Sequence, residues 1–162
     1  MQVPVSWIKA VVGVVLAAWA VWLFLLWQPA RQVELHTLNL LERVSARDWP
    51  AVEAMMAPDY RDAWGHDRRT AIDEARQLFS HFFALQIVLL SPLEMAADVD
   101  GWEASAPVGI FGSGTPVAQA VIDEVRNSAG PATFVWRRDG GWPWQWCLVE
   151  VRHEELASRW PR

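Results

Sequence analysis

The chain has 162 residues, a formal net charge of −5 and a 52% share of hydrophobic residues. It has no basic stripe with interleaved aromatics, which argues against a nucleic-acid partner. Its single cysteine, Cys147, excludes an intrachain disulfide and a cysteine-based zinc cage. The spacing of the 4 histidines is not that of a metal pair, and no glycine-rich dinucleotide loop is present, so we expect neither a metal nor a cofactor.

An uncharged apolar run from Ala10 to Trp27 dominates the first part of the chain. A run of this length is enough for a transmembrane helix, and its bracketing tryptophans are ~30 Å apart at helical rise. Tryptophan, lysine and arginine side chains at the ends of a membrane helix favour the headgroup region of the bilayer. The predicted anchoring residues are Trp7, Lys9, Trp27 and Arg31. The sequence therefore predicts a short tail over 1–9, a single transmembrane helix over 10–28, and the lipid bilayer as a partner.

A cleaved signal peptide is the competing interpretation of this leader. The stretch 18–20, Ala-Trp-Ala, has the small residues of a cleavage site, but cutting there would leave an exposed apolar terminus. The basic residues beside the run are too evenly divided to orient it, and a downstream domain of this length can translocate largely regardless of its charge. We expect an uncleaved anchor with the domain outside the cytoplasm, in the periplasm if the source is bacterial.

Three helices are predicted after the anchor. The first, over 32–47, has an apolar stripe at helical spacing, and Asp48 then caps a short helix that ends near Met56. Asp67 caps the third helix, which we expect to run to about Ala84. Its apolar face comprises Ile72, Ala75, Phe79, Phe82 and Phe83, and that of the first helix Val33, Thr37, Leu40, Leu41 and Val44.

Strands follow. An apolar strand is predicted over 86–90, and it continues over 93–99 after an interruption. A hairpin turn at Asp100-Gly101 then leads into a returning strand over 102–111. The segment 115–127 is ambiguous between helix and strand, and its four-residue repeat of valines favours a helix. Two strands over 132–138 and 142–152 are joined by Asp139-Gly140-Gly141, and 154–162 is predicted to be a tail.

Helices followed by antiparallel strands indicate an α+β protein. With ARDWPAVEAMMAPDYRDAW leading into a helix, then a hairpin, then TFVWRRDGGWPWQW, the stretch 32–153 resembles the nuclear-transport-factor-2-like superfamily. The resemblance implies a cone-like domain of three helices packed on a curved antiparallel sheet, with a pocket at the open end. The superfamily includes enzymes similar to ketosteroid isomerase and scytalone dehydratase, non-catalytic binding domains, and accessory domains that dimerise through the sheet. The resemblance therefore leaves function open.

One cluster of titratable residues surrounds the only tyrosine, Tyr60. Isomerase-type enzymes use a carboxylate base beside a tyrosine donor, so Asp62 or His66 as base and Tyr60 as donor form a candidate catalytic site. The alternative is that Asp59-Tyr60 is a turn and that Asp62 and His66 lie in a solvated loop. Because the predicted strand interiors offer no buried acid or base, we favour the alternative.

The last predicted strand carries three alternating tryptophans, Trp142, Trp144 and Trp146, on one face. They are either packed into the core or exposed as a docking or dimer surface. We expect a membrane-anchored, non-catalytic binding or assembly module, whose partner is a membrane protein or a second copy bound through the sheet. The alternatives are an isomerase- or dehydratase-type enzyme using Tyr60 and Asp62, and a pocket that holds an apolar ligand.

Overall fold

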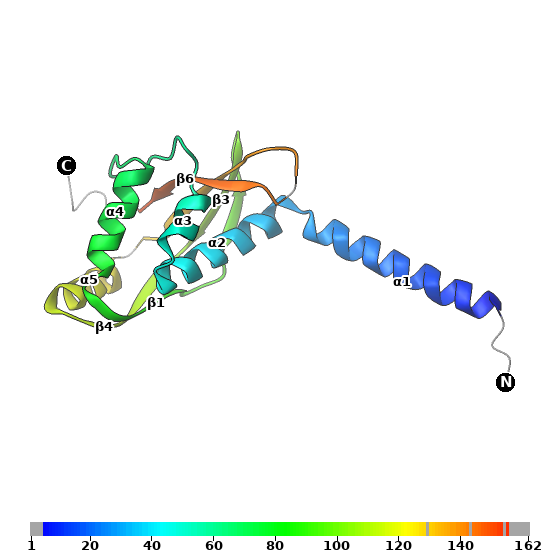
Figure 1. Ribbon diagram of the computed structural model, residues 1–162, viewed down its shortest axis with the longest axis horizontal. Helices are drawn as coiled ribbons and strands as arrows, with labels where there is room; N and C mark the ends of the chain where they lie inside the picture. The colour runs from blue at the N-terminus through cyan, green and yellow to red at the C-terminus, as the bar shows by residue number, and fades with distance from the viewer. Residues whose placement is uncertain (1–4, 129, 143, 154, 156–162) are drawn as a thin grey trace.

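The computed structural model describes residues 5–128, 130–142, 144–153 and 155, without the side chains of 5–10 and 25–26. It opens with helix α1 (Val5–Leu26), which extends away from the remaining elements (Figure 1). Most of its described apolar side chains are exposed, among them Val14 at 70% and Trp22 at 56%. Among the described residues, no single helix meets the length and hydropathy expected of a membrane span, but Val11–Phe24 and Pro29–Ala46, bent by 68°, meet them as a pair. The anchor over 10–28 stays a prediction.

Helix α2 (Pro29–Ala46) begins two residues after α1 and carries the predicted apolar stripe, of which Val33, Thr37, Leu40 and Leu41 are buried. It packs against several strands of the domain. The Trp136 indole, fully buried, donates from Nε1 to Thr37 Oγ1 at 3.0 Å, and Thr37 Oγ1 donates to the Val33 carbonyl at 2.9 Å. Since a buried polar group must be paired, this chain of hydrogen bonds fixes α2 on the sheet.

Two shorter helices follow α2 in the chain. In α3 (Trp49–Met55) the cap Asp48 accepts from the Ala51 amide at 3.4 Å, and in α4 (Arg68–Phe79) the cap Asp67 accepts from the Thr70 amide at 2.8 Å. Both predicted caps are confirmed. The prediction that the third helix reaches Ala84 is wrong, because strand β1 starts at Phe82 and its alternation leaves Phe83 77% exposed.

The strands form two antiparallel sheets instead of one. Strands β2 (Glu94–Ala97), β3 (Gly101–Ala106), β5 (Ala132–Arg138) and β6 (Trp146–Arg152) pair in the order β2-β3-β5-β6. Strand β1 (Phe82–Leu89) pairs separately with β4 (Val108–Gly114). The strand predicted over 102–111 is therefore divided, and Pro107 lies at the division, where a missing amide hydrogen interrupts the ladder.

The ambiguous segment is a helix, α5 (Pro116–Asn127), which packs on β4. Among the described residues the domain thus has four helices, α2 to α5, which are the three of the predicted architecture and the helix favoured for the ambiguous segment. The last strand starts at Trp146 and not at 142, because the described residues 139–142, 144 and 145 belong to the loop before it. The ends of this loop are joined by the Asp139 amide, which donates to the Gln145 carbonyl at 2.8 Å.

Candidate functional site

A cavity of about 510 Å³ lies between the helices and the strands. Side chains from α2, α3, α4 and α5 and from both sheets line it, and most of them are aliphatic or aromatic. Its ionisable lining residues are Tyr60, Asp62, His66, Glu74, Glu124 and His153. Glu74 is exposed and His66 partly exposed, so the cavity meets solvent beside α4. A mostly apolar hollow with a few polar groups at one side is the usual form of a small-molecule site.

The segment 56–67 between α3 and α4 brings three of these groups to the cavity. It runs alongside β6, because the amides of Ala57, Arg61 and Ala63 donate to carbonyls of that strand at 2.8–3.2 Å. The segment then doubles back through Gly65, whose φ of 86° suits glycine. Tyr60, Asp62 and His66 are therefore positioned by backbone pairing to the sheet and not by a solvated loop.

Asp62 is the centre of this turn. Its side chain is 6% exposed, and Oδ1 accepts from the amides of Trp64 at 3.0 Å and His66 at 2.8 Å. Oδ2 lies 3.0 Å from His66 Nδ1. Since a carboxylate only accepts, this contact favours the tautomer with hydrogen on Nδ1 and leaves His66 Nε2 able to take up a proton. The pair has the arrangement of an oriented base.

Tyr60 is 4% exposed and lines the same cavity. Burial raises the pKa of its phenol well above the usual range, and the nearby charges of Asp62 and Glu150 raise it further. The hydroxyl therefore stays protonated across the physiological range and can act as a hydrogen-bond donor to a bound molecule.

His153 is a lining residue that the sequence reasoning missed. It follows β6, is 8% exposed, and has Nε2 3.5 Å from Ser128 Oγ. Burial lowers its pKa, although Glu155 opposes the shift, so the neutral imidazole is favoured. Val151 also lines the cavity, and residues two apart on a strand lie on the same face. This alternation was the one signal in the sequence that could have predicted His153 as a lining residue.

The structure separates the other predicted residues. Trp146 is 8% exposed and belongs to the core, whereas Trp142 and Trp144 are 58% and 53% exposed in the loop before β6. The predicted single face of three tryptophans is wrong, because strand alternation does not hold in that loop. Trp27 is 55% exposed and Arg31 pairs with Glu34 at 2.7 Å. The side chains of Trp7 and Lys9 lie outside the described residues, as does most of the predicted tail over 154–162.

Within the described part of the chain, no group of three His, Cys, Asp or Glu side chains is arranged to hold a metal ion. Tyr60, Asp62 and His66 can instead donate, accept and transfer protons to a molecule in the cavity. Which of these capacities is used depends on the ligand.

No family model and no curated protein matches the chain. Several solved structures do. A candidate dehydratase of the NTF2-like family from Streptomyces avermitilis has a TM-score of 0.55 at 16% identity, over 75% of this chain and 91% of that one. An NTF2-like protein of unknown function from Pseudomonas putida has a TM-score of 0.54 at 16% identity, and the match covers 75% of this chain and 82% of that one.

A third structure, Bd1075 of Bdellovibrio bacteriovorus, has a TM-score of 0.55 at 10% identity. The match covers 75% of this chain but 39% of that protein, so it corresponds to a part of a longer chain. At these identities the likeness is one of fold. The α+β domain that follows α1 has the nuclear-transport-factor-2-like fold.

Proposed function

We propose that this protein is a membrane-anchored binding domain that takes a small, mostly apolar molecule with one or two polar groups into its cavity. The observation that carries the proposal is the cavity of about 510 Å³ with aliphatic and aromatic walls and a polar group at Tyr60. A ligand would bury its apolar body against the helices and accept a hydrogen bond from the phenol.

Anchorage is supported by α1. Most of its large described apolar side chains are about half exposed or more, with Phe24 at 70% and Trp19 at 57%. Exposed apolar surface of this extent is unfavourable in water and is stabilised by a lipid environment. The anchor would keep the domain at one membrane and raise its concentration near partners in that membrane.

Binding can be tested with 2-naphthol as the probe, using thermal unfolding of the full chain in detergent. We expect the probe to raise the melting temperature of the wild type. Ala75→Phe, which fills the cavity from α4, should abolish the shift, whereas Gln77→Phe on the exposed face of the same helix should keep it. An equal shift in all three proteins would contradict a ligand site in this cavity.

Acid–base catalysis is the second candidate function, and the Asp62–His66 contact inside the cavity wall favours it. An oriented imidazole and a protonated phenol could move a proton at a carbon next to a carbonyl. The test is hydrogen–deuterium exchange at the α-carbons of 2-tetralone in D₂O, followed by NMR. Faster exchange with the wild type than with His66→Gln would support catalysis, and equal rates would leave only binding.

A further inference from the structure

The loop between β5 and β6 exposes two large aromatic side chains. The rings of Trp142 and Trp144 stack with centroids 5.0 Å apart and an interplanar angle of 18°. Gln145 makes two hydrogen bonds to Trp142. Its side-chain Oε1 accepts from the Trp142 backbone amide at 3.2 Å, and its backbone amide donates to the Trp142 carbonyl at 3.1 Å. Both indoles are therefore exposed beside a hydrogen-bonded pair of loop residues, although water is a poor environment for them.

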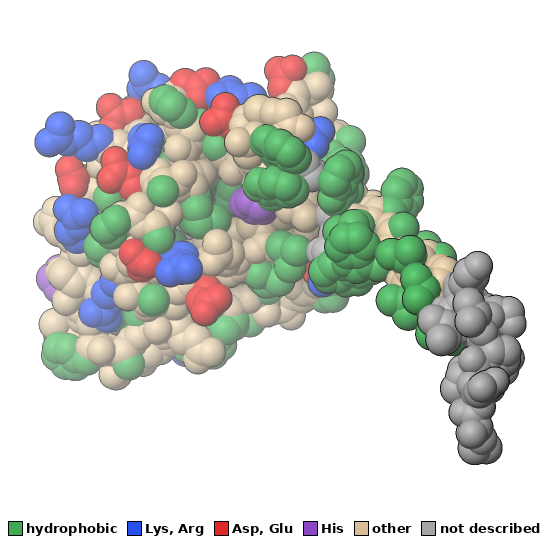
Figure 2. Space-filling view, turned by 45° about the vertical axis from the view of Figure 1, so that its right-hand side comes forward, with side chains coloured by type: hydrophobic (Ala, Val, Ile, Leu, Met, Phe, Trp, Pro, Cys, Tyr) green, Lys and Arg blue, Asp and Glu red, His purple; other side chains and the backbone are tan. Residues whose placement is uncertain are grey.

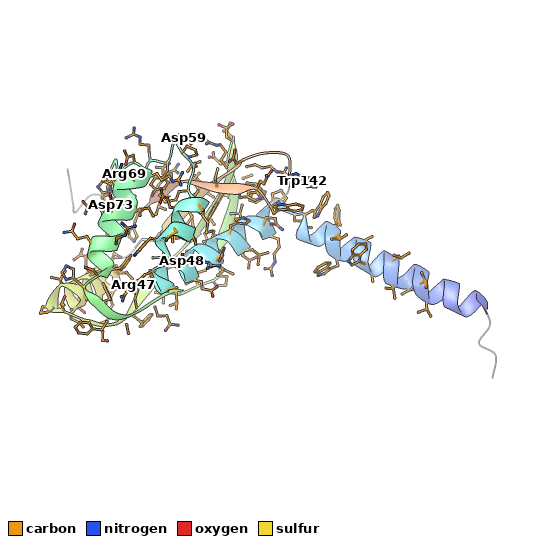
Figure 3. The ribbon with its side chains drawn as sticks, in the orientation of Figure 1. Arg47, Asp48, Asp59, Arg69, Asp73 and Trp142 are labelled. Carbon is orange, nitrogen blue, oxygen red and sulfur yellow. The ribbon has the colours of Figure 1, made fainter. Side chains whose placement is uncertain are left out.

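This loop lies at the end of the domain from which α1 leaves. Figure 1 shows it reaching the point where α1 passes into α2, and Figure 3 places Trp142 there. Figure 2, turned by 45°, shows hydrophobic side chains gathered over the same end. Trp27, the exposed residue just after α1, belongs to this end as well.

We propose that the β5–β6 loop is a second membrane contact, in which Trp142 and Trp144 enter the headgroup region of the bilayer that holds α1. The inference rests on the proposed anchorage. Indoles prefer this region because one part of the ring system is apolar and the N–H is polar. Once α1 is inserted the second contact is intramolecular, so a modest affinity is enough to restrict how the domain turns about the α1–α2 junction.

A bilayer fits this surface better than a second protein does. The exposed aromatic surface consists of two side chains, and its neighbours Arg138, the last residue of β5, and Asp139, in the loop, are charged and exposed. A specific protein interface buries about 1,000 Å² or more, whereas tryptophan is enriched at membrane–water interfaces without a requirement for so large a surface. The loop is also brought to the membrane by its own chain.

The test places a fluorophore on the loop of the full chain in phosphatidylcholine vesicles. Gly141→Cys is suitable because, apart from its two chain neighbours, no described residue has an atom within 4 Å of an added Cβ. Native Cys147 is 7% exposed, and burial raises the pKa of its thiol, so it should stay unlabelled. Val117→Cys, 46% exposed on α5 at the opposite end of the domain, is the matched control (Figure 1).

Lipids with a nitroxide on the headgroup should quench the Gly141→Cys probe several-fold more than the Val117→Cys probe. Replacing Trp142 and Trp144 together by alanine should remove the difference while the melting temperature stays the same. Equal quenching at the two positions in vesicle-bound protein would overturn the inference and leave the anchorage standing. Crosslinking between two Gly141→Cys copies without lipid quenching would assign the loop to a dimer and also overturn it.

Vesicle flotation of the same samples distinguishes a wrong assignment of the loop contact from a wrong assignment of the membrane anchor. The full chain should float with the vesicles and resist extraction at high pH. A chain that stays in the aqueous fraction would overturn the anchorage, and with it the second contact. A loop variant lacking both indoles should still float, because α1 is retained.

Discussion

Replacing Asp62 by alanine tests whether the segment 56–67 is a built wall of the cavity or a solvated loop. The carboxylate, 6% exposed, accepts from two backbone amides at 2.8–3.0 Å and contacts His66 Nδ1 at 3.0 Å. Hydrogen bonds to a charged group contribute about 1.5–3 kcal/mol each, but the amides regain water when the turn opens. We therefore expect Asp62→Ala to lower the free energy of unfolding by about 2–4 kcal/mol.

Asp62→Asn is the conservative partner, because its amide oxygen can still accept from the two backbone amides. It should cost about 1 kcal/mol. Asp67→Ala is the control in the same segment, an exposed cap whose loss should lower the free energy of unfolding less than the loss of the Asp62 carboxylate does. Thermal unfolding of the full chain in detergent, followed by circular dichroism, reports these changes at about 3–5 °C per kcal/mol. If Asp62→Ala melts within about 2 °C of the wild type, the segment is a solvated loop and the reasoning is refuted.

Variants at three further positions test the core and the cavity by the same measurement. Thr37→Val leaves the buried indole N–H of Trp136 without its acceptor and should lower the free energy of unfolding by about 1–3 kcal/mol. Thr37→Ser keeps a hydroxyl and should lower it less. Equal melting temperatures of Thr37→Val and the wild type would show that the hydrogen bond contributes little. Gly101→Ala should cost about 1–3 kcal/mol, because its Cβ would meet the Trp136 carbonyl, and an unchanged melting temperature would disprove that close approach. Burial lowers the pKa of His153 from 6.5, so the unfolded chain binds more protons below that pH and stability should fall as the pH drops below about 6.5. His153→Gln should flatten this dependence, and an identical pH profile would contradict a buried neutral imidazole.

Local signals in the sequence predicted much of the helical part. The stripe on α2 and the caps at Asp48 and Asp67 follow from spacing and from single side chains, and the structure confirms them. The helix in the ambiguous segment is also confirmed, with Pro116 in its first turn. These features depend on residues within a turn or two of one another, which a single sequence displays directly.

The strand boundaries depended on partners far away in the chain. Phe82 joins β1 because it pairs with Gly114, and nothing near Phe82 distinguishes this from the end of a helix. The strand predicted over 102–111 fails at Pro107 because its two halves pair in different sheets. Register and sheet membership are long-range choices that periodicity does not reveal.

The candidate site was predicted in part for the same reason. The grouping of Tyr60, Asp62 and His66 came from their closeness in sequence, and all three line the cavity. The burial of Tyr60 and of the Asp62 side chain was not predicted, because it depends on backbone hydrogen bonds between the segment 56–67 and β6. His153 was missed because it is remote from them in sequence and reaches the cavity only through the β5–β6 pairing.

Helix α2 connects the two halves of the proposed function. Two residues separate it from α1, and its later residues Leu40, Leu41 and Val44 line the cavity. The ionisable lining residues of that cavity come from the segment 56–67, from α4 and α5 and from the residue after β6, and α4, α5 and the segment 56–67 lie away from α1 (Figure 1). If α1 and the β5–β6 loop both hold the membrane, the cavity meets solvent on the side facing away from the bilayer. A ligand would then enter from water and not from lipid, which suits a molecule with a polar group to place beside Tyr60.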